Sequence, residues 1–178
     1  MILNERDVRN ENVIDIARKM MVAARTAPKG KGVDIIEVGM VTGEDIKELS
    51  DMTRKIGEHK EMKFFLRDSE NILSAEAIVL VGSALETQGL NCFHCGYTTC
   101  GEKPKDVPCV INTVDIGIAL GSACSVAADY RVDTRIMFSV GLAAQELNYL
   151  DESKCVFAIP VSASSKNPFF DRKSKSEK

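Results

Sequence analysis

The sequence predicts a single layered domain, of the α/β or α+β class, in which helices and strands are interspersed. Segments with helical periodicity alternate along the chain with several short strand candidates. At 178 residues the chain is long enough for one core of ordinary size, and it shows no internal repeat or domain linker. We therefore assign residues 1–165 to one domain. Residues 166–178 form a polar, lysine-rich tail that we expect to be partly disordered.

The chain begins with a predicted helix, followed by a loop and a strand. Apolar residues at helical spacing predict the helix over Val13 to Ala24, with Asn10 or Asn12 as its N-cap. Pro28 and the glycines after it end the helix in a loop. The β-branched run from Val33 to Val38 then predicts the first strand.

Four elements are predicted before the cysteine-rich part of the chain. Thr42 resembles the N-cap of a helix whose buried stripe runs from Ile46 to Ile56. A short strand over Met62 to Leu66 and a short helix over Ser69 to Ala75 follow. The run from Ala77 to Gly82 is continuously apolar, which predicts a strand buried on both faces.

Two helices and one strand are predicted after the cysteines. Asn112 or Thr113 caps a helix that continues to Tyr130, and a second helix spans Asp133 to Leu150. The first of these helices has one face of small residues, which would let another helix approach closely. These residues are Gly117, Gly121, Ser125 and Ala128. The last strand spans residues 154–162, and Pro160 indicates a sheet edge or a strand end.

Composition narrows the classes of function. The net charge of −3 gives no general attraction to nucleic acid or to anionic lipid, so we expect neither partner. The N-terminus lacks the apolar region of a signal peptide, and the uninterrupted apolar runs are too short to span a bilayer. We therefore expect a cytoplasmic protein. Disulfides are rare in that compartment, so clustered cysteines indicate metal ligands or redox groups.

Four of the six cysteines lie close together in the segment 89–110, directly after the predicted buried strand. The segment follows the spacing Cys-x2-Cys-x4-Cys, with a fourth cysteine nine positions later. We call these residues the loop cysteines: Cys92, Cys95, Cys100 and Cys109. A two-residue spacer lets both thiolates of the first pair reach one centre. Gly89, Gly96 and Gly101 allow the backbone angles that such a loop needs, and Phe93 and Tyr97 could shield the centre from water.

Three interpretations of the loop cysteines compete. Unrelated buried thiols do not fit a polar segment punctuated by glycines. A structural zinc site usually has two short-spaced cysteine pairs, and only one such pair is present here. An iron-sulfur cluster accommodates the observed spacing, although spacing alone does not separate iron from zinc.

The stretch "NCFHCGYTTC" resembles the Cys-x2-Cys-Gly-(Tyr/Phe)-x2-Cys signature of small 4Fe-4S domains. The whole chain also resembles an uncharacterised prokaryotic family of ferredoxin-domain-containing proteins, through "AARTAPKGKGVD", "DIGIALGSA", "DTRIM" and "IPVSASSKNPFFDR". This resemblance implies a 4Fe-4S cluster bound by the loop cysteines, with no established substrate. Small 4Fe-4S domains usually place their fourth cysteine further downstream than Cys109.

The stretch "AARTAPKGKG" is similar to the N-terminal flavin-binding region of the nitroreductase superfamily. That superfamily has an α+β homodimeric fold that holds FMN between its subunits, so the resemblance implies a nitroreductase-like α+β domain. FMN would then involve Arg25, Lys29, Gly30 and Lys31. Alternating lysines and glycines could form an anion-binding nest, but the loop follows a helix C-terminus, whose dipole repels anions. A solvated connector is the alternative.

Together these observations predict an iron-sulfur electron-transfer protein on a nitroreductase-like α+β scaffold. The small-residue helix face predicts a homodimer, and a redox protein or a small molecule would be its partner. Whether the chain is an enzyme, such as an oxidoreductase, is left open by the sequence. The alternatives are an FMN-dependent reductase and a zinc-stabilised, non-enzymatic interaction module.

Overall fold

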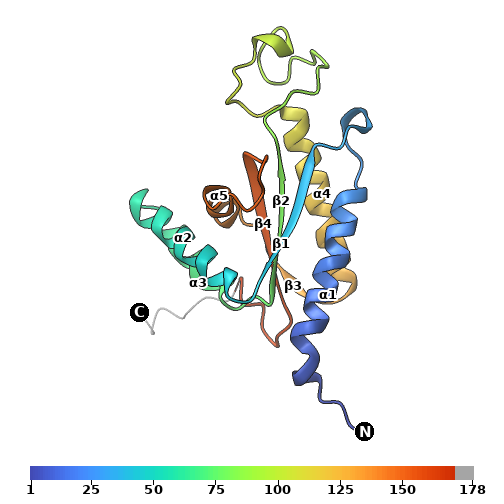
Figure 1. Cartoon of the computed structure of the whole chain (residues 1–178), viewed down its shortest axis with the longest axis vertical. Helices are drawn as coiled ribbons and strands as arrows, with labels where there is room; N and C mark the ends of the chain where they lie inside the picture. Colours follow the sequence, from blue (N-terminus) through green and yellow to red (C-terminus); the bar gives the residue numbers. More distant parts are fainter. Residues whose placement is uncertain (171–178) are drawn as a thin grey trace.

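The computed structural model describes residues 1–170 and shows a four-stranded sheet between two layers of helices (Figure 1). The strands are β1 (Ile36–Thr42), β2 (Ala77–Ser83), β3 (Asp133–Thr134) and β4 (Cys155–Ser162). Their order in the sheet is β1-β2-β4-β3, and all neighbours are antiparallel. The predicted α+β class is therefore confirmed.

Helices cover both faces of the sheet. On one face lie α1 (Glu5–Thr26) and α4 (Val110–Asp129), which pack against each other along much of their length (Figure 1). On the other face lie α2 (Asp45–His59), α3 (Lys63–Ile72) and α5 (Phe138–Glu146). The two layers enclose two separate apolar clusters, one on each side of the sheet.

Strand β2 contributes to both clusters because its side chains alternate between the two faces. Val79 and Val81 pack in the cluster with α1 and α4, whereas Ile78 and Leu80 pack in the cluster with α2 and α5. All seven residues of β2 are buried. This position explains the continuous apolar run, and the strand prediction for this segment is confirmed.

The first helix and strand differ from prediction only at their ends. Helix α1 starts earlier than predicted, at Glu5, because Asn4 caps it by accepting a hydrogen bond of 3.1 Å from the backbone N–H of Arg6. Strand β1 begins at Ile36 and ends at Thr42. The prediction that Thr42 caps the next helix is therefore wrong, since it belongs to the strand.

The sequence predicts the wrong secondary structure for two segments. Helix α3 replaces both the strand predicted from Met62 and the short helix predicted from Ser69. Residues 133–150 do not form one helix, because Asp133 and Thr134 pair with the end of β4 and Met137 bridges to Ala158 before α5 begins. Helix α4 starts at Val110 with Cys109 as its N-cap, earlier than either predicted cap.

Within residues 1–170, α4 alone is long and apolar enough, by length and composition, to cross a membrane. Length and composition alone do not distinguish a membrane span from the core helix of a soluble protein. One face of α4 packs on α1 and the sheet, as in the core helix of a soluble protein. The opposite face is exposed and carries the predicted small residues together with Val114 and Ile118.

The end of the described chain packs onto the body of the protein. Phe169 is fully buried in the cluster with α2 and α5, although it lies in the predicted tail. Phe170 is exposed. The disorder predicted for the final residues concerns 171–178, which lie outside the described residues.

Candidate metal centre and the adjoining glycine loop

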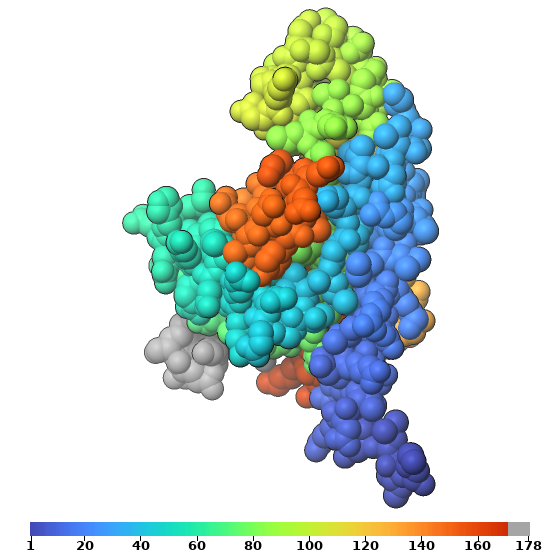
Figure 2. Space-filling view, in the orientation of Figure 1, coloured from blue at the N-terminus to red at the C-terminus, as the bar shows by residue number. Residues whose placement is uncertain are grey.

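Residues 84–109 form a long loop between β2 and α4 at one end of the molecule, where they build a separate lobe (Figures 1 and 2). Its only regular element in the structure is the 3-10 turn η2 (Cys100–Glu102). The chain takes positive φ angles at Gly89, Asn91, Phe93 and Gly96. Four such residues within eight positions fold the backbone tightly on itself, as the predicted roles of Gly89 and Gly96 required.

All four loop cysteines line a single cavity. Phe93 and Tyr97 also line it, but Phe93 is 66% exposed, so the predicted shielding from water is partial. Within residues 1–170, no three histidine, cysteine or acidic side chains are close enough to bind one metal ion. The four thiols share one cavity, and those of Cys95 and Cys109 are in contact with each other.

Backbone N–H groups donate to two of the sulfur atoms. The N–H of Val110, the first residue of α4, lies 3.3 Å from Sγ of Cys95. The N–H of Asn91 lies 3.3 Å from Sγ of Cys100, and the side chain of Asn91 accepts a bond of 2.8 Å from the N–H of Cys100. Such N–H···S contacts orient thiolate ligands and tune the potential of a bound centre.

Cys109 is the most buried of the loop cysteines and occupies the N-cap of α4. Burial alone would raise the pKa of its thiol. Backbone hydrogen bonds from Gln88, Asn112 and Ile111, together with a contact to the side chain of Cys95, outweigh burial and hold the pKa below its ordinary value. The start of a helix is electropositive, which stabilises a thiolate there.

Two buried polar residues that the sequence analysis missed also line the cavity. Lys103 is only 7% exposed; its Nζ donates to the carbonyl of Pro104 at 2.9 Å and to that of Val107. It has no ion pair among residues 1–170. Gln88 is 6% exposed, and its Nε2 is buried with no hydrogen-bond partner in the same part of the chain. No sequence pattern marks either residue, because their burial follows from the course of the loop.

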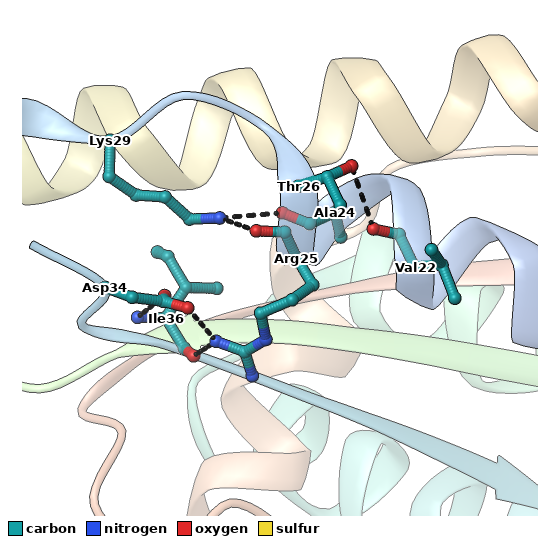
Figure 3. Close-up of polar contacts among 7 residues, drawn as sticks. All are labelled: Val22, Ala24, Arg25, Thr26, Lys29, Asp34 and Ile36. Carbon is teal, nitrogen blue, oxygen red and sulfur yellow. Dashed lines mark hydrogen bonds and ion pairs between the residues drawn. The ribbon is translucent and has the colours of Figure 1, made fainter. Parts of the chain in front are cut away.

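We call residues 27–35, which connect α1 to β1, the glycine loop. Arg25, near the end of α1, contacts the last part of this loop and the start of β1 (Figure 3). Its Nη1 donates to Asp34 Oδ2 at 2.7 Å and to the carbonyl of Ile36 at 2.6 Å. Partial burial alone would raise the pKa of Asp34, but hydrogen bonds from Arg25 and from the N–H of Ile36 hold the pKa below its usual range. Arg25 therefore already has partners within the chain.

The other three predicted flavin-loop residues also make internal contacts. Lys29 Nζ donates to the carbonyls of Ala24, at 3.3 Å, and Arg25 at the C-terminus of α1 (Figure 3). The N–H of Gly30, in the 3-10 turn η1 (Gly30–Gly32), donates to both carboxylate oxygens of buried Asp115, at 3.0 and 2.9 Å.

Lys31 connects the glycine loop to the lobe of residues 84–109. Its Nζ donates to the carbonyl of Gln88 at 3.0 Å. A Cβ added to Gly30 would lie 2.7 Å from the side chain of Ile111, another residue of the cysteine cavity. The two predicted sites are therefore neighbours, although they are far apart in the sequence.

Comparison with known proteins places this chain in a family. Residues 105–172 match a family described as "Uncharacterized protein containing a ferredoxin domain", a segment that includes Cys109 but not the first three loop cysteines. An uncharacterised protein of Archaeoglobus fulgidus is 40% identical over 97% of this chain and 98% of its own length. The chain belongs to this ferredoxin-domain family.

Solved structures share the fold at low sequence identity. A nitroreductase with bound FMN from Bacteroides fragilis matches 90% of this chain and 82% of its own, with a TM-score of 0.60 and 11% identity. A BluB-like flavoprotein from Clostridium difficile matches 92% and 86%, with a TM-score of 0.57 and 19% identity. The chain spans only 58 to 63% of several larger oxidoreductases that it also resembles. The predicted nitroreductase-like fold is confirmed.

Proposed function

We propose that this family member is an iron-sulfur redox protein in which the loop cysteines hold a 4Fe-4S cluster. The observation that carries the proposal is the convergence of all four thiols on one cavity. In a 4Fe-4S cluster each of the four cysteines binds a different iron, so the sulfurs must surround a space. A single zinc ion would need all four sulfurs within about 2.3 Å of one point. The description of the matched family, which names a ferredoxin domain, supports the cluster over the zinc-stabilised module.

The charge distribution around the cavity also supports an anionic centre. Lys103 lines the cavity of the four thiols and is buried, and within residues 1–170 only backbone carbonyls accept its hydrogen bonds. A buried ammonium is costly without a counter-charge. Four thiolates with iron and sulfide carry net negative charge, which would supply a counter-charge for the Lys103 ammonium.

The residues of the lobe have distinct tasks in this proposal. The N–H groups of Asn91 and Val110 hold the sulfurs of Cys100 and Cys95 in place. A bound cluster would supply reversible one-electron transfer. Phe93 is exposed at the end of the molecule, where a redox partner protein or a small acceptor could come close to the centre.

Metal and sulfide analysis of anaerobically purified protein tests the proposal. We expect about four iron atoms and four sulfides per chain and, after reduction, the electron paramagnetic resonance signal of a single cluster. Stoichiometric zinc without iron in protein expressed with both metals would contradict the proposal. The as-isolated protein and protein reconstituted with iron and sulfide should give the same result.

A flavin-dependent oxidoreductase is the second candidate function, in which FMN would exchange electrons with the metal centre. The contact between Lys31 and Gln88 favours it, because it brings the glycine loop against the cysteine cavity. For FMN phosphate to bind, Lys29 or Lys31 would have to exchange a carbonyl partner for the ligand. If the anaerobically purified protein is denatured, flavin fluorescence in the supernatant would support this candidate. No flavin fluorescence from protein that was first incubated with FMN would exclude it.

A homodimer through α4 is also part of the proposal, as is a cytoplasmic location without nucleic-acid or membrane partners. All six cysteines are free thiols, which suits a reducing compartment. The exposed face of α4 is apolar and has open space above Gly117 and Gly121. A second helix could therefore pack closely there.

Replacing Ile118 with arginine is expected to convert the dimer to a monomer. Ile118 is 40% exposed on α4, so the change costs the monomer little but would bury a charge in the interface. Light scattering coupled to size-exclusion chromatography measures the mass. Leu73→Arg is the matched control, since Leu73 is an exposed apolar residue at the end of α3. A monomeric wild type at micromolar concentration would refute the interface.

A further inference from the structure

Gln88 touches the cysteine cavity, a loop cysteine and the glycine loop. It lines the cavity, its backbone hydrogen-bonds the thiol of Cys109, and its carbonyl accepts from Lys31 at 3.0 Å. These backbone contacts fix its position from two sides. Its side-chain amide carbon lies 3.8 Å from the position of a Cβ added at Gly30, where the glycine loop borders the cavity.

The side-chain amide of Gln88 has an unused donor. Nε2 is buried, and residues 1–170 provide no hydrogen-bond partner for it. An amide N–H left unpaired in a protein interior costs free energy, so most such groups have a partner, whether protein, water or ligand. Four of the side chains that line this cavity are cysteines, and their sulfur atoms can accept a hydrogen bond. Lys103, the other buried donor lining the cavity, already donates to two carbonyls.

We propose that the Gln88 amide donates a hydrogen bond to a sulfur of the bound centre and thereby raises its reduction potential. This inference rests on the proposed function. A donor to sulfur stabilises the reduced, more negative state more than the oxidised state, because the hydrogen bond strengthens with the charge of its acceptor. Gln88 is thus a positioning and tuning residue rather than a metal ligand.

The variant Gln88→Met removes the donor and keeps a side chain of similar length. We expect the midpoint potential to become more negative by about 59 mV, which corresponds to a tenfold change in a one-electron equilibrium and is typical of one hydrogen bond. Leu90→Met is the matched control, because Leu90 lines the same cavity and neither side chain has a donor. Its potential should stay within the error of the wild type.

The measurement is a redox titration followed by electron paramagnetic resonance, with iron content determined for each sample. An iron-free wild type would overturn the proposed function itself. An iron-loaded Gln88→Met protein with the wild-type potential would overturn only the role of Gln88.

A labelling experiment covers the case in which Gln88→Met fails to hold iron. The chain has two glutamines, Gln88 and Gln145, and Gln145 lies in α5 outside the cysteine lobe. Wild-type protein with ¹⁵N in its glutamine side chains should show nitrogen coupling to the reduced centre in pulsed electron paramagnetic resonance. Gln145→Glu protein labelled in the same way should keep that coupling. Loss of the coupling in the Gln145→Glu protein, or its absence from the wild type, would overturn the inference.

Discussion

Replacing Gly141 with alanine is expected to destabilise the fold strongly. Gly141 is buried in α5, where the helix packs directly on β4. An added Cβ would lie 2.0 Å from the carbonyl oxygen of Val156 and 2.6 Å from Cα of Phe157. These are backbone atoms of a paired strand, so they cannot move aside as a flexible side chain could. We expect the free energy of unfolding to fall by more than about 3 kcal/mol, at or beyond the usual cost of overpacking.

The same substitution at Gly117 serves as the control. Gly117 lies in the interior of α4, and a Cβ added there meets no atom within 4 Å. Because alanine favours helix more than glycine does, Gly117→Ala should stabilise the monomer by about 0.5–1 kcal/mol. Urea denaturation of both variants, at a concentration where the protein is monomeric, measures the two effects. Equal stability of the two variants would contradict the close packing of α5 on β4.

Much of the fold could be predicted because its central strand carries an unambiguous signal. Strand β2 is apolar up to its last residue, Ser83, because both of its faces are covered, and the sequence shows this directly. Helix α3 was mistaken in part for a strand because two of its buried positions are polar. Asp68 and Ser69 lie in its buried stripe, and Asp68 is accommodated by hydrogen bonds from Arg67 and from Ser139 in α5. Those partners depend on tertiary packing, so the burial of Asp68 could not be predicted from the sequence.

The four cysteines of the candidate metal centre were predicted, but the buried polar residues around them were not. Cysteine spacing identified residues that the structure places around one cavity. Lys103 and Gln88 were not predicted, because a buried polar residue in a loop has no periodic signature. The contact between Gly30 and Asp115 joins residues 85 positions apart, so the proximity of the glycine loop to the cysteine cavity was equally invisible in the sequence.

Serine substitutions at Cys95 and Cys109 are expected to abolish metal binding. Each replaces a sulfur with an oxygen of nearly the same shape, so the fold should remain while one ligand is lost. Changes to residues that only support a ligand already weaken metal binding about 10- to 100-fold, so loss of a ligand should exceed 100-fold. Iron and sulfide content after anaerobic purification measures the effect. Cys124→Ala is the control, because Cys124 lies in α4 outside the cavity and burial raises the pKa of its thiol.

The comparison between Cys95→Ser and Cys109→Ser is informative, because Cys109 is both a candidate ligand and the N-cap of α4. If Cys109→Ser keeps its iron while Cys95→Ser loses it, the fourth ligand is another residue.

None of the loop cysteines belongs to either apolar cluster, so the core should form without metal. Metal removal should therefore increase amide hydrogen exchange in residues 84–109 and leave β2 and β4 protected. Exchange that rises throughout the sheet would instead show that the metal centre is required for the whole fold.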